Sequence, residues 1–371
     1  MTDETNPEFD RIDGAPHPRE TADLYGQSTA EQSFLAAFNG ARLHHGWLIT
    51  GPRGVGKATL AWRIARFLLA QEPAGGLFTP PPPTTLAIPP DHPVVRRSLA
   101  LSEPRLKLIR RDWDAEDKKA DTVITVKRIR DLKGFFQMSA ADGGRRVVII
   151  DCADEMNPNA ANALLKVLEE PPKDATLLLI SHQPSRLLPT IRSRCRELRC
   201  AALGPADMAL ALAQAGAEVQ DVQALAELSG GSVGEAVRLV MQDGMALYAE
   251  IVTLMATLPR LDRARALALT ESAAGRANEA RFDLILRLIE QFLARAARTG
   301  LFLPPPEAAK GEAALLTRLA PDAAAARRWA DLQQTLGARA RQGKAVNLDP
   351  AALLLDMVLR MEEVAAALPT R

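Results

Sequence analysis

Seven consecutive residues early in the chain have the types and spacing of a phosphate-binding loop. They are Gly51, Pro52, Arg53, Gly54, Val55, Gly56 and Lys57. Glycines at these spacings let backbone N–H groups surround a polyphosphate, and the lysine reaches its outer phosphates. The alternative is a glycine-rich turn that only joins two elements. Because a short apolar strand precedes the loop and a strong helix follows it, the sequence favours the phosphate loop.

The residue after the lysine departs from the pattern. A Ser or Thr there would hold Mg²⁺, and this chain has Ala58. Thr59 follows, but one step along a helix turns the side chain by about 100°, so Thr59 is a poor substitute. We therefore expect weak binding of ATP or ADP, with the magnesium site impaired.

A second chemical feature is Asp151, which ends the apolar run 146–150. In phosphate-loop proteins an Asp at this place orients the metal and its water. A hydrolysing enzyme needs a carboxylate beside it as general base, but the next residue is Cys152, whose thiol is unsuited to that role. We expect Asp154 and Glu155 to be solvated charges that open the next helix. The site is thus predicted to hold nucleotide without hydrolysing it.

The cysteines and the basic residues give weaker signals. Cys152, Cys195 and Cys200 contain no C-x-x-C pair, so neither a disulfide framework nor a four-cysteine zinc site is expected. His92 is interpreted as an exposed loop residue. The basic run 105–111 favours a strand with solvated flanks over a surface that faces DNA, although phosphate contacts need no particular sequence.

The surrounding elements predict how these residues are positioned. Strands are expected at 45–50, 106–109, 146–150 and 176–180, and helices at 30–38, 58–70, 126–136 and 159–170. Continuous apolar strands are typical of a parallel sheet that is buried on both faces. The alternation of strand and helix up to residue 200 predicts an open α/β sheet. Beyond residue 204 only helical patterns remain, including the stripe Phe282, Ile285, Leu288, Ile289 and Phe292.

Composition sets the class of protein. The 371 residues suggest roughly two to three domains, and 47% hydrophobic with 25% charged residues is typical of globular chains. A net charge of +1 excludes a strongly basic nucleic-acid coat protein. No uncharged apolar run reaches the ~18 residues that a membrane span needs. The acidic, proline-punctuated start lacks the features of a signal peptide. We expect a cytoplasmic protein with no membrane contact and a disordered leader at residues 1–21.

Two longer motifs carry a family resemblance. Asn162-Ala-Leu-Leu-Lys-Val-Leu-Glu-Glu-Pro-Pro172 and Leu188-Pro-Thr-Ile-Arg-Ser-Arg-Cys195 closely resemble bacterial sliding-clamp loaders of the AAA+ class. The resemblance runs motif by motif over about residues 25–240. It implies a P-loop AAA+ domain at 22–202 with a proline-rich insertion at 71–93. It further implies a small helical lid at 203–265 and, at 266–371, an all-helical bundle that joins a ring-shaped collar of subunits.

The resemblance also implies a role for the motif formed by Ser193, Arg194 and Cys195. In the family it supplies an arginine finger to the ATP of a neighbouring subunit, where a guanidinium neutralises charge on the transferring phosphoryl group. Arg194 would be that finger. The alternative is an ordinary surface arginine among Arg192, Arg194, Arg196 and Arg199.

The departures from the family pattern distinguish the type of subunit. Motor subunits carry Glu where this chain has Cys152, and a lid arginine where it has Gly234. Together with Ala58, three catalytic parts are missing while the finger motif is kept. The family's four-cysteine zinc module is absent too, so no zinc is expected. This pattern resembles the delta-prime, or stator, subunits of DNA polymerase III.

The implied partners are the gamma/tau and delta subunits of the loader, the sliding clamp and primed DNA, within a hetero-oligomer that acts in DNA replication. Two alternatives stay open at this point. One is a catalytically active motor ATPase of the gamma/tau type, and the other is a nucleotide-binding regulatory adaptor.

Overall fold

The computed structural model describes residues 8, 11–40, 43–71, 81–114, 119–137 and 144–368. The chain divides into two compact units. The first is Met1–Glu218 together with Ser232–Val237, and the second is Val219–Gly231 together with Arg238–Arg371. This division does not separate a lid from a collar, so the three-domain boundaries at residues 202 and 265 stay a prediction.

The first unit is built on a five-stranded parallel sheet of order β2-β5-β6-β1-β7. Its strands are β1 Gly46–Thr50, β2 Leu106–Ile109, β5 Arg146–Ile150, β6 Ala175–Ile180 and β7 Arg196–Arg199. In register, Leu48 of β1 lies between Leu179 of β6 and Glu197 of β7. All residues of β1 and β6 are buried, as their continuous apolar sequences predict.

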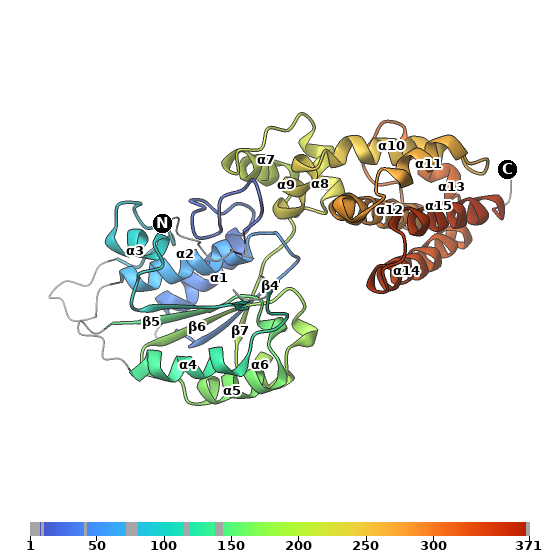
Figure 1. Cartoon of the computed structure of the whole chain (residues 1–371). Coiled ribbons are helices and arrows are strands. Elements are labelled where there is room, and N and C mark those ends of the chain that lie inside the picture. The colour runs from blue at the N-terminus through green and yellow to red at the C-terminus, as the bar shows by residue number, and fades with distance from the viewer. Residues whose placement is uncertain are drawn as a thin grey trace, which may run out of the picture. The chain divides into compact units, whose positions relative to one another are not determined.

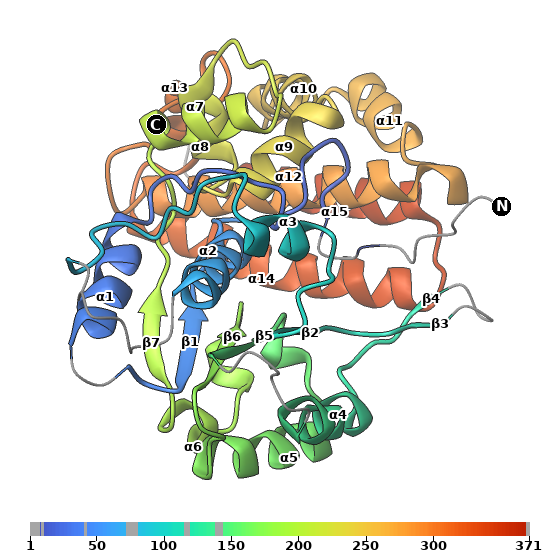
Figure 2. The same cartoon turned by 90° about the vertical axis from the view of Figure 1, so that its left-hand side faces the viewer.

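Helices cover both faces of this sheet (Figures 1 and 2). On one face lie α1 Ser28–Asn39, α2 Lys57–Ala70 and α3 Pro93–Leu99. On the other lie α4 Val126–Gln137, α5 Pro158–Glu169 and α6 Pro189–Arg192. The core of the second face joins apolar residues of the strands to Ile129, Leu132, Leu164 and Leu168. The result is the three-layer α/β architecture that the sequence predicts.

The boundaries of α5 follow from its sequence. Asn157 caps the helix, because its Oδ1 accepts the backbone N–H of Ala160 at 2.8 Å, and Pro158 occupies the first helical position. Pro171 and Pro172 cannot continue the helix. The capped start fixes α5 directly after the loop that contains Asp151.

Smaller elements complete the first unit. The strands β3 Trp113–Asp114 and β4 Lys119–Ala120 form an antiparallel pair, and short 3₁₀ turns occupy η1 Ala153–Glu155 and η2 Pro184–Arg186. The strands β3 and β4 and the helix α3 were not predicted from the sequence. His92 is the N-cap of α3, since its Nδ1 accepts the N–H of Val94 at 3.2 Å, and it is only partly exposed. His92 thus lies in a loop, as expected, but it is half-buried rather than exposed because it caps α3.

After β7 every described element is a helix. These are α7 Pro205–Gln214, α8 Val222–Leu228, α9 Val233–Met241, α10 Gly244–Ala256, α11 Arg263–Glu271, η3 Arg276–Asn278, α12 Glu279–Thr299, α13 Glu312–Leu319, α14 Ala323–Ala345 and α15 Pro350–Ala366. All five residues of the predicted stripe on α12 are buried. Glu312 is also fully buried, where Arg295, Tyr248 and the N–H of Ala308 all donate to its carboxylate.

The predicted disorder of residues 1–21 is wrong for residues 11–21. They have no helix or strand but are held by turn hydrogen bonds, and His17 is fully buried. The sequence pattern did not predict this order, because residues 11–21 are held by contacts with α2 and α3 and have no periodicity of their own. Of the proline-rich insertion, residues 72–80 lie outside the described part. Residues 81–92 form neither helix nor strand, as predicted.

In the described part of the chain, no single helix is long and apolar enough to span a membrane. The helices α9 and α10, bent by 81° at their junction, meet the length and composition criterion only as a pair.

Candidate nucleotide site

The phosphate loop joins β1 to α2, as predicted, and its backbone conformation requires its glycines. Gly51, Gly54 and Gly56 have φ values of 137°, 76° and 99°, a region that residues with a side chain rarely adopt. At Gly51 a Cβ would lie 2.3 Å from the carbonyl oxygen of Cys200, so the neighbouring strand end excludes any side chain there. Glycine is therefore required at these positions by the backbone conformation of the loop, and at Gly51 also by the lack of space for a side chain.

Lys57 begins α2 and points back into the loop. It is only 3% exposed, and its Nζ donates to the carbonyl oxygens of Gly51, at 2.8 Å, and of Pro52. Burial lowers its pKa to about 8, although the charge of Asp151 acts in the opposite direction. Ala58 supplies no hydroxyl beside it, and Thr59 is buried one position further along. The loop has the conformation that suits a polyphosphate but lacks the usual magnesium ligand.

The carboxyl ends of β1, β5 and β6 meet at one edge of the sheet, where ligands of open α/β sheets bind. Asp151 follows β5 there and is buried. Cys152 comes next in a left-handed conformation, with φ 57°, and its Sγ lies 3.8 Å from Asp151 Oδ1. Burial, followed by the charge of Asp151, raises the pKa of the Cys152 thiol far above its usual value. The thiol therefore stays protonated and cannot act as a base.

His182 is the site residue that the sequence analysis missed. It follows β6 at the same sheet edge, and its Nε2 lies 3.3 Å from Cys152 Sγ. Burial, then the charges of Lys57 and Arg53, lower its pKa to about 4, so the ring is neutral at pH 7. The rule that polar residues after neighbouring parallel strands converge could have identified it.

Asp154 was expected to be a solvated charge, and that expectation is wrong. The side chain is buried, and its two oxygens accept the backbone N–H groups of His182 at 3.1 Å and Gln183 at 3.2 Å. Asp154 therefore fixes the loop that carries His182. Glu155 pairs with Arg111 at 2.9 Å instead of remaining fully solvated.

A second unpredicted residue, Gln27, ties the loop to β7. Its side-chain amide donates to the carbonyls of Val55 at 3.0 Å and Ala201 at 2.8 Å, and accepts the N–H of Ala201 at 2.9 Å. On the same side of the loop, the N–H of Gly234 donates to the carbonyl of Gly54 at 3.0 Å. Gly234 thus lies directly on the phosphate loop.

Arg194 lies at the other end of β1. Its carbonyl oxygen is 3.2 Å from where a Cβ of Gly46 would stand, and Gly46 begins the strand that ends at the phosphate loop. With four steps of ~3.3 Å along the strand, the two ends of β1 are about 13 Å apart. The Arg194 side chain is 37% exposed and donates to the carbonyl of Thr190 at 3.1 Å. Ser193 donates to the same carbonyl, also at 3.1 Å.

The other predicted cysteines are packing residues in this geometry. Cys195 lies beside Gly46 and the core of the second sheet face, and burial raises the pKa of its thiol to about 12. Cys200 is buried at the end of β7, where burial raises its thiol pKa to about 11. Among the described residues, no group of three or more His, Cys, Asp or Glu side chains is placed to hold a metal ion.

The basic run 105–111 forms the edge strand β2 and its flanks. Lys107, Arg110 and Arg111 help to line a cavity of about 420 Å³. Arg105 pairs with Glu103 at 3.2 Å, so these flanks carry ion pairs as well as solvated charge. The strand expected here is confirmed.

The sequence of this chain is similar to those of several known proteins. Residues 26–203 match the family described as DNA polymerase III, delta subunit. The delta' subunit of DNA polymerase III from Pseudomonas aeruginosa is 40% identical over 237 residues, which cover 62% of this chain and 66% of that protein. The delta' subunit from Bacillus subtilis is 34% identical over 206 residues, 55% of this chain and 56% of that protein. The chain therefore matches between half and two thirds of the length of these relatives.

One solved structure matches this chain weakly. The DNA polymerase III gamma-subunit-related protein of Thermotoga maritima matches with a TM-score of 0.41 at 15% identity, over 90% of this chain and 99% of that one.

A phosphate loop between β1 and α2 of a parallel sheet of this order, with a buried aspartate at the end of β5, defines a P-loop protein of the AAA+ class. The sequence matches specify the family further. Over residues 26–203 the chain matches the family described as DNA polymerase III, delta subunit, and it is similar in sequence to DNA polymerase III delta' subunits.

Proposed function

We propose that this protein is the stator subunit of a sliding-clamp loader in DNA replication. In this role it helps to load the clamp onto primed DNA by giving Arg194 to the ATP site of a neighbouring gamma/tau-type subunit. It does not hydrolyse ATP itself. Its partners are the gamma/tau and delta subunits, the clamp and primed DNA.

The observation that carries the proposal is the separation of Arg194 from the chain's own phosphate loop. The backbone of Arg194 packs at the Gly46 end of β1, whereas Lys57 follows the opposite end. A phosphoryl group in this chain's own loop is therefore out of reach of that arginine. Because the side chain is more than one-third exposed, a second subunit can present its nucleotide to it.

The chain's own site supports the absence of hydrolysis. Cys152 replaces the general base, and its thiol is paired with a neutral imidazole rather than ionised. Ala58 offers no magnesium ligand, and Gly234 carries no charge toward the loop. Loss of a general base alone typically costs 10²–10⁴ in rate.

A bound nucleotide would be held by the loop residues Gly51, Pro52, Arg53, Gly54, Val55, Gly56 and Lys57, with Ala58, Thr59 and Asp151 beside them. Their conformation fits a polyphosphate, because the glycines adopt the left-handed backbone of a phosphate loop. When bound, ATP or ADP would supply anionic oxygens to the loop N–H groups and to Lys57. Since the magnesium ligand is missing, we infer that this binding is weak and insensitive to magnesium.

The test is Arg194→Ala in a loader reconstituted with its partner subunits. We expect normal assembly with a partial loss of DNA-stimulated ATPase and of clamp loading, because a loader with several sites loses only one finger. An arginine finger in trans is worth 10³–10⁵ in rate at its own site. Arg194→Lys should rescue poorly, since a point charge cannot replace the planar guanidinium.

Arg192→Ala is the matched control, because Arg192 is an exposed arginine two positions before Arg194, at the end of α6. Equal behaviour of the Arg194 and Arg192 variants would refute the finger. ATP turnover by the isolated chain would instead favour a motor subunit, and failure to assemble with loader subunits would favour a regulatory adaptor.

A further inference from the structure

A segment without helix or strand lies across the start of α2 and reaches the phosphate loop. We call residues 11–27 the strap. Arg66 of α2 donates to the carbonyl of Arg19 at 2.5 Å, and Arg63 donates to that of Ala22 at 2.9 Å. The buried ring of His17 meets Trp62 of α2 edge-on, with ring centroids 6.5 Å apart. The strap is thus fixed to the helix that starts at Lys57.

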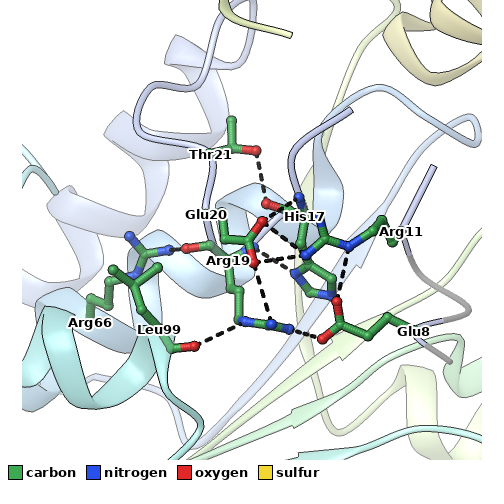
Figure 3. A network of polar contacts seen from close by, with 8 residues as sticks. All are labelled: Glu8, Arg11, His17, Arg19, Glu20, Thr21, Arg66 and Leu99. Carbon is green, nitrogen blue, oxygen red and sulfur yellow. Dashed lines mark hydrogen bonds and ion pairs between the residues drawn. The ribbon is translucent and has the colours of Figure 1, made fainter. Parts of the chain in front are cut away.

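Ion pairs hold the strap in one shape (Figure 3). The guanidinium of Arg19 pairs with Glu8 and donates to the carbonyl of Leu99 at 3.1 Å. The carboxylate of Glu20 accepts from Arg11 at 2.8 Å and from the N–H of His17 at 3.1 Å. The Arg19 side chain is only 11% exposed, so its contacts are shielded from competing water. Glu8 and Arg11 therefore converge on Arg19 and Glu20 and hold the first half of the strap in place.

Two apolar side chains of the strap lie where the glycines of the nucleotide site leave room. At Gly56 a Cβ would stand 2.7 Å from Cδ1 of Leu24. At Gly234 a Cβ would stand 2.7 Å from Cδ1 of Ile12 and 3.1 Å from the Cα of Gly54. Ile12 therefore occupies the volume that a side chain at position 234 would need. Gly234 itself lies between Ile12 and Gly54 of the loop.

From these contacts we infer that the strap is an intramolecular closure of the nucleotide site. Ile12 and Leu24 cover the loop from outside, and the Gly234–Gly54 backbone hydrogen bond joins the covering layer to the loop. Inside, Lys57 is already bonded to the carbonyls of Gly51 and Pro52. A nucleotide must displace the strap to reach the loop N–H groups.

This inference rests on the nucleotide site of the proposed function and concerns its regulation. When a binding-competent state is only partly populated, the apparent Kd rises by the inverse of its fraction. The strap thus lowers the affinity of the loop for nucleotide, and the missing magnesium ligand lowers it further. The strap also explains why position 234 is a glycine, since any larger residue there would displace Ile12 from the loop.

The experiment is calorimetric titration of the full-length protein with ADP. We expect Ile12→Gly to bind ADP at least tenfold more tightly than the wild type, because the strap loses its contact with Gly234. Arg19→Ala should act in the same direction by releasing the strap at a different point, which guards against a folding defect of one variant. Asp23→Ala is the control, since the Asp23 side chain is exposed and the substitution alters the same strap by one residue.

Hydrogen exchange provides a readout besides affinity. Addition of ADP should increase exchange in residues 11–24 while it slows exchange in residues 51–57. Equal ADP affinities of wild type, Ile12→Gly and Arg19→Ala, with loss of binding on Lys57→Ala, would overturn the closure but leave the nucleotide site intact. Absence of binding by every variant at millimolar ADP would overturn both, whereas the Arg194 assay would still decide the stator role.

Discussion

Arg194 forms an ion pair with Glu169 at the end of α5, in which Nη2 lies 2.9 Å from Oε1. Both side chains are more than one-third exposed, so the pair is of the kind that contributes about 0–1 kcal/mol. An arginine that acts on a phosphate in another subunit must leave this partner. The pair therefore holds the guanidinium only loosely between encounters.

The first prediction concerns Glu169→Ala in the reconstituted loader. Because the ion pair must break before Arg194 reaches a phosphate, its removal should leave the DNA-stimulated ATPase unchanged or raise it by up to about fivefold, equivalent to ~1 kcal/mol. Steady-state turnover with primed DNA is the measurement. A loss as large as that of Arg194→Ala would mean that Glu169 positions the finger.

The second prediction is that the isolated chain does not turn over ATP, with or without primed DNA. Cys152 offers a protonated thiol in place of a base, and Ala58 provides no metal ligand. We expect Cys152→Glu alone to remain inactive, because the magnesium ligand is still missing and residue 152 keeps its left-handed backbone. A rate above roughly 1 s⁻¹ in a phosphate-release assay, the range of ordinary enzymes, would contradict this expectation.

The third prediction concerns pH and His182. Its pKa falls from 6.5 to about 4 on folding, chiefly through burial. Between these values the unfolded chain binds a proton that the native protein does not, so stability is full above pH 6.5 and falls as the pH drops toward 4. The loss attributable to His182 is about 3 kcal/mol, at 1.36 kcal/mol per unit of pKa.

Urea denaturation of the wild type and His182→Asn at pH 7 and pH 4.5 measures this effect. The wild type should lose more stability than the variant over that interval. Identical pH dependences of the two proteins would show that His182 titrates normally.

The fourth prediction concerns the buried carboxylate of the second unit. Glu312 is fully buried and accepts from Arg295 Nε at 2.7 Å and from the Tyr248 hydroxyl at 2.5 Å. Glu312→Ala would remove the close partner of the buried Arg295 and leave it only the 4.0 Å contact with Glu227 as an ion pair. Breaking a buried ion pair typically costs 3–5 kcal/mol. Hydrogen exchange in α12 should accelerate accordingly, and this local readout does not require the whole chain to unfold in one step.

Arg339→Ala is the control for that comparison. Arg339 pairs with Asp356 at 3.3 Å and is 54% exposed, so its loss should change stability by less than about 1 kcal/mol. Similar exchange rates in the two variants would contradict a stabilising role for the buried network.

The fifth prediction is that the protein holds no structural zinc. Cys195 is half-buried and Cys200 is buried, both have raised thiol pKa values, and thiolates are the form that binds zinc. Elemental analysis after dialysis against a chelator should find well below one equivalent of zinc. One retained equivalent would require a site that these cysteines do not provide.

The sequence alone determined the architecture of the first unit, because its signals are local. Continuous apolar runs at 146–150 and 175–180 specify strands buried on both faces, and the glycine spacing at 51–56 specifies a loop that no other residues could form. Helix α12 was equally predictable from its apolar stripe. Each of these features depends on neighbours within a few residues, which the pattern contains.

Only the tertiary structure decided which distant residues meet. His182 reaches Cys152 because parallel strands β5 and β6 end at the same sheet edge, 30 positions apart in sequence. Ile12 reaches Gly234 across more than half of the chain, through a strap with no periodicity to reveal it. Arg194 is separated from Lys57 by the length of β1. The Ser193-Arg194-Cys195 motif alone does not predict at which end of β1 this arginine lies. Such contacts are made by the folding of the sheet and the packing of side chains upon it, and no local pattern encodes them.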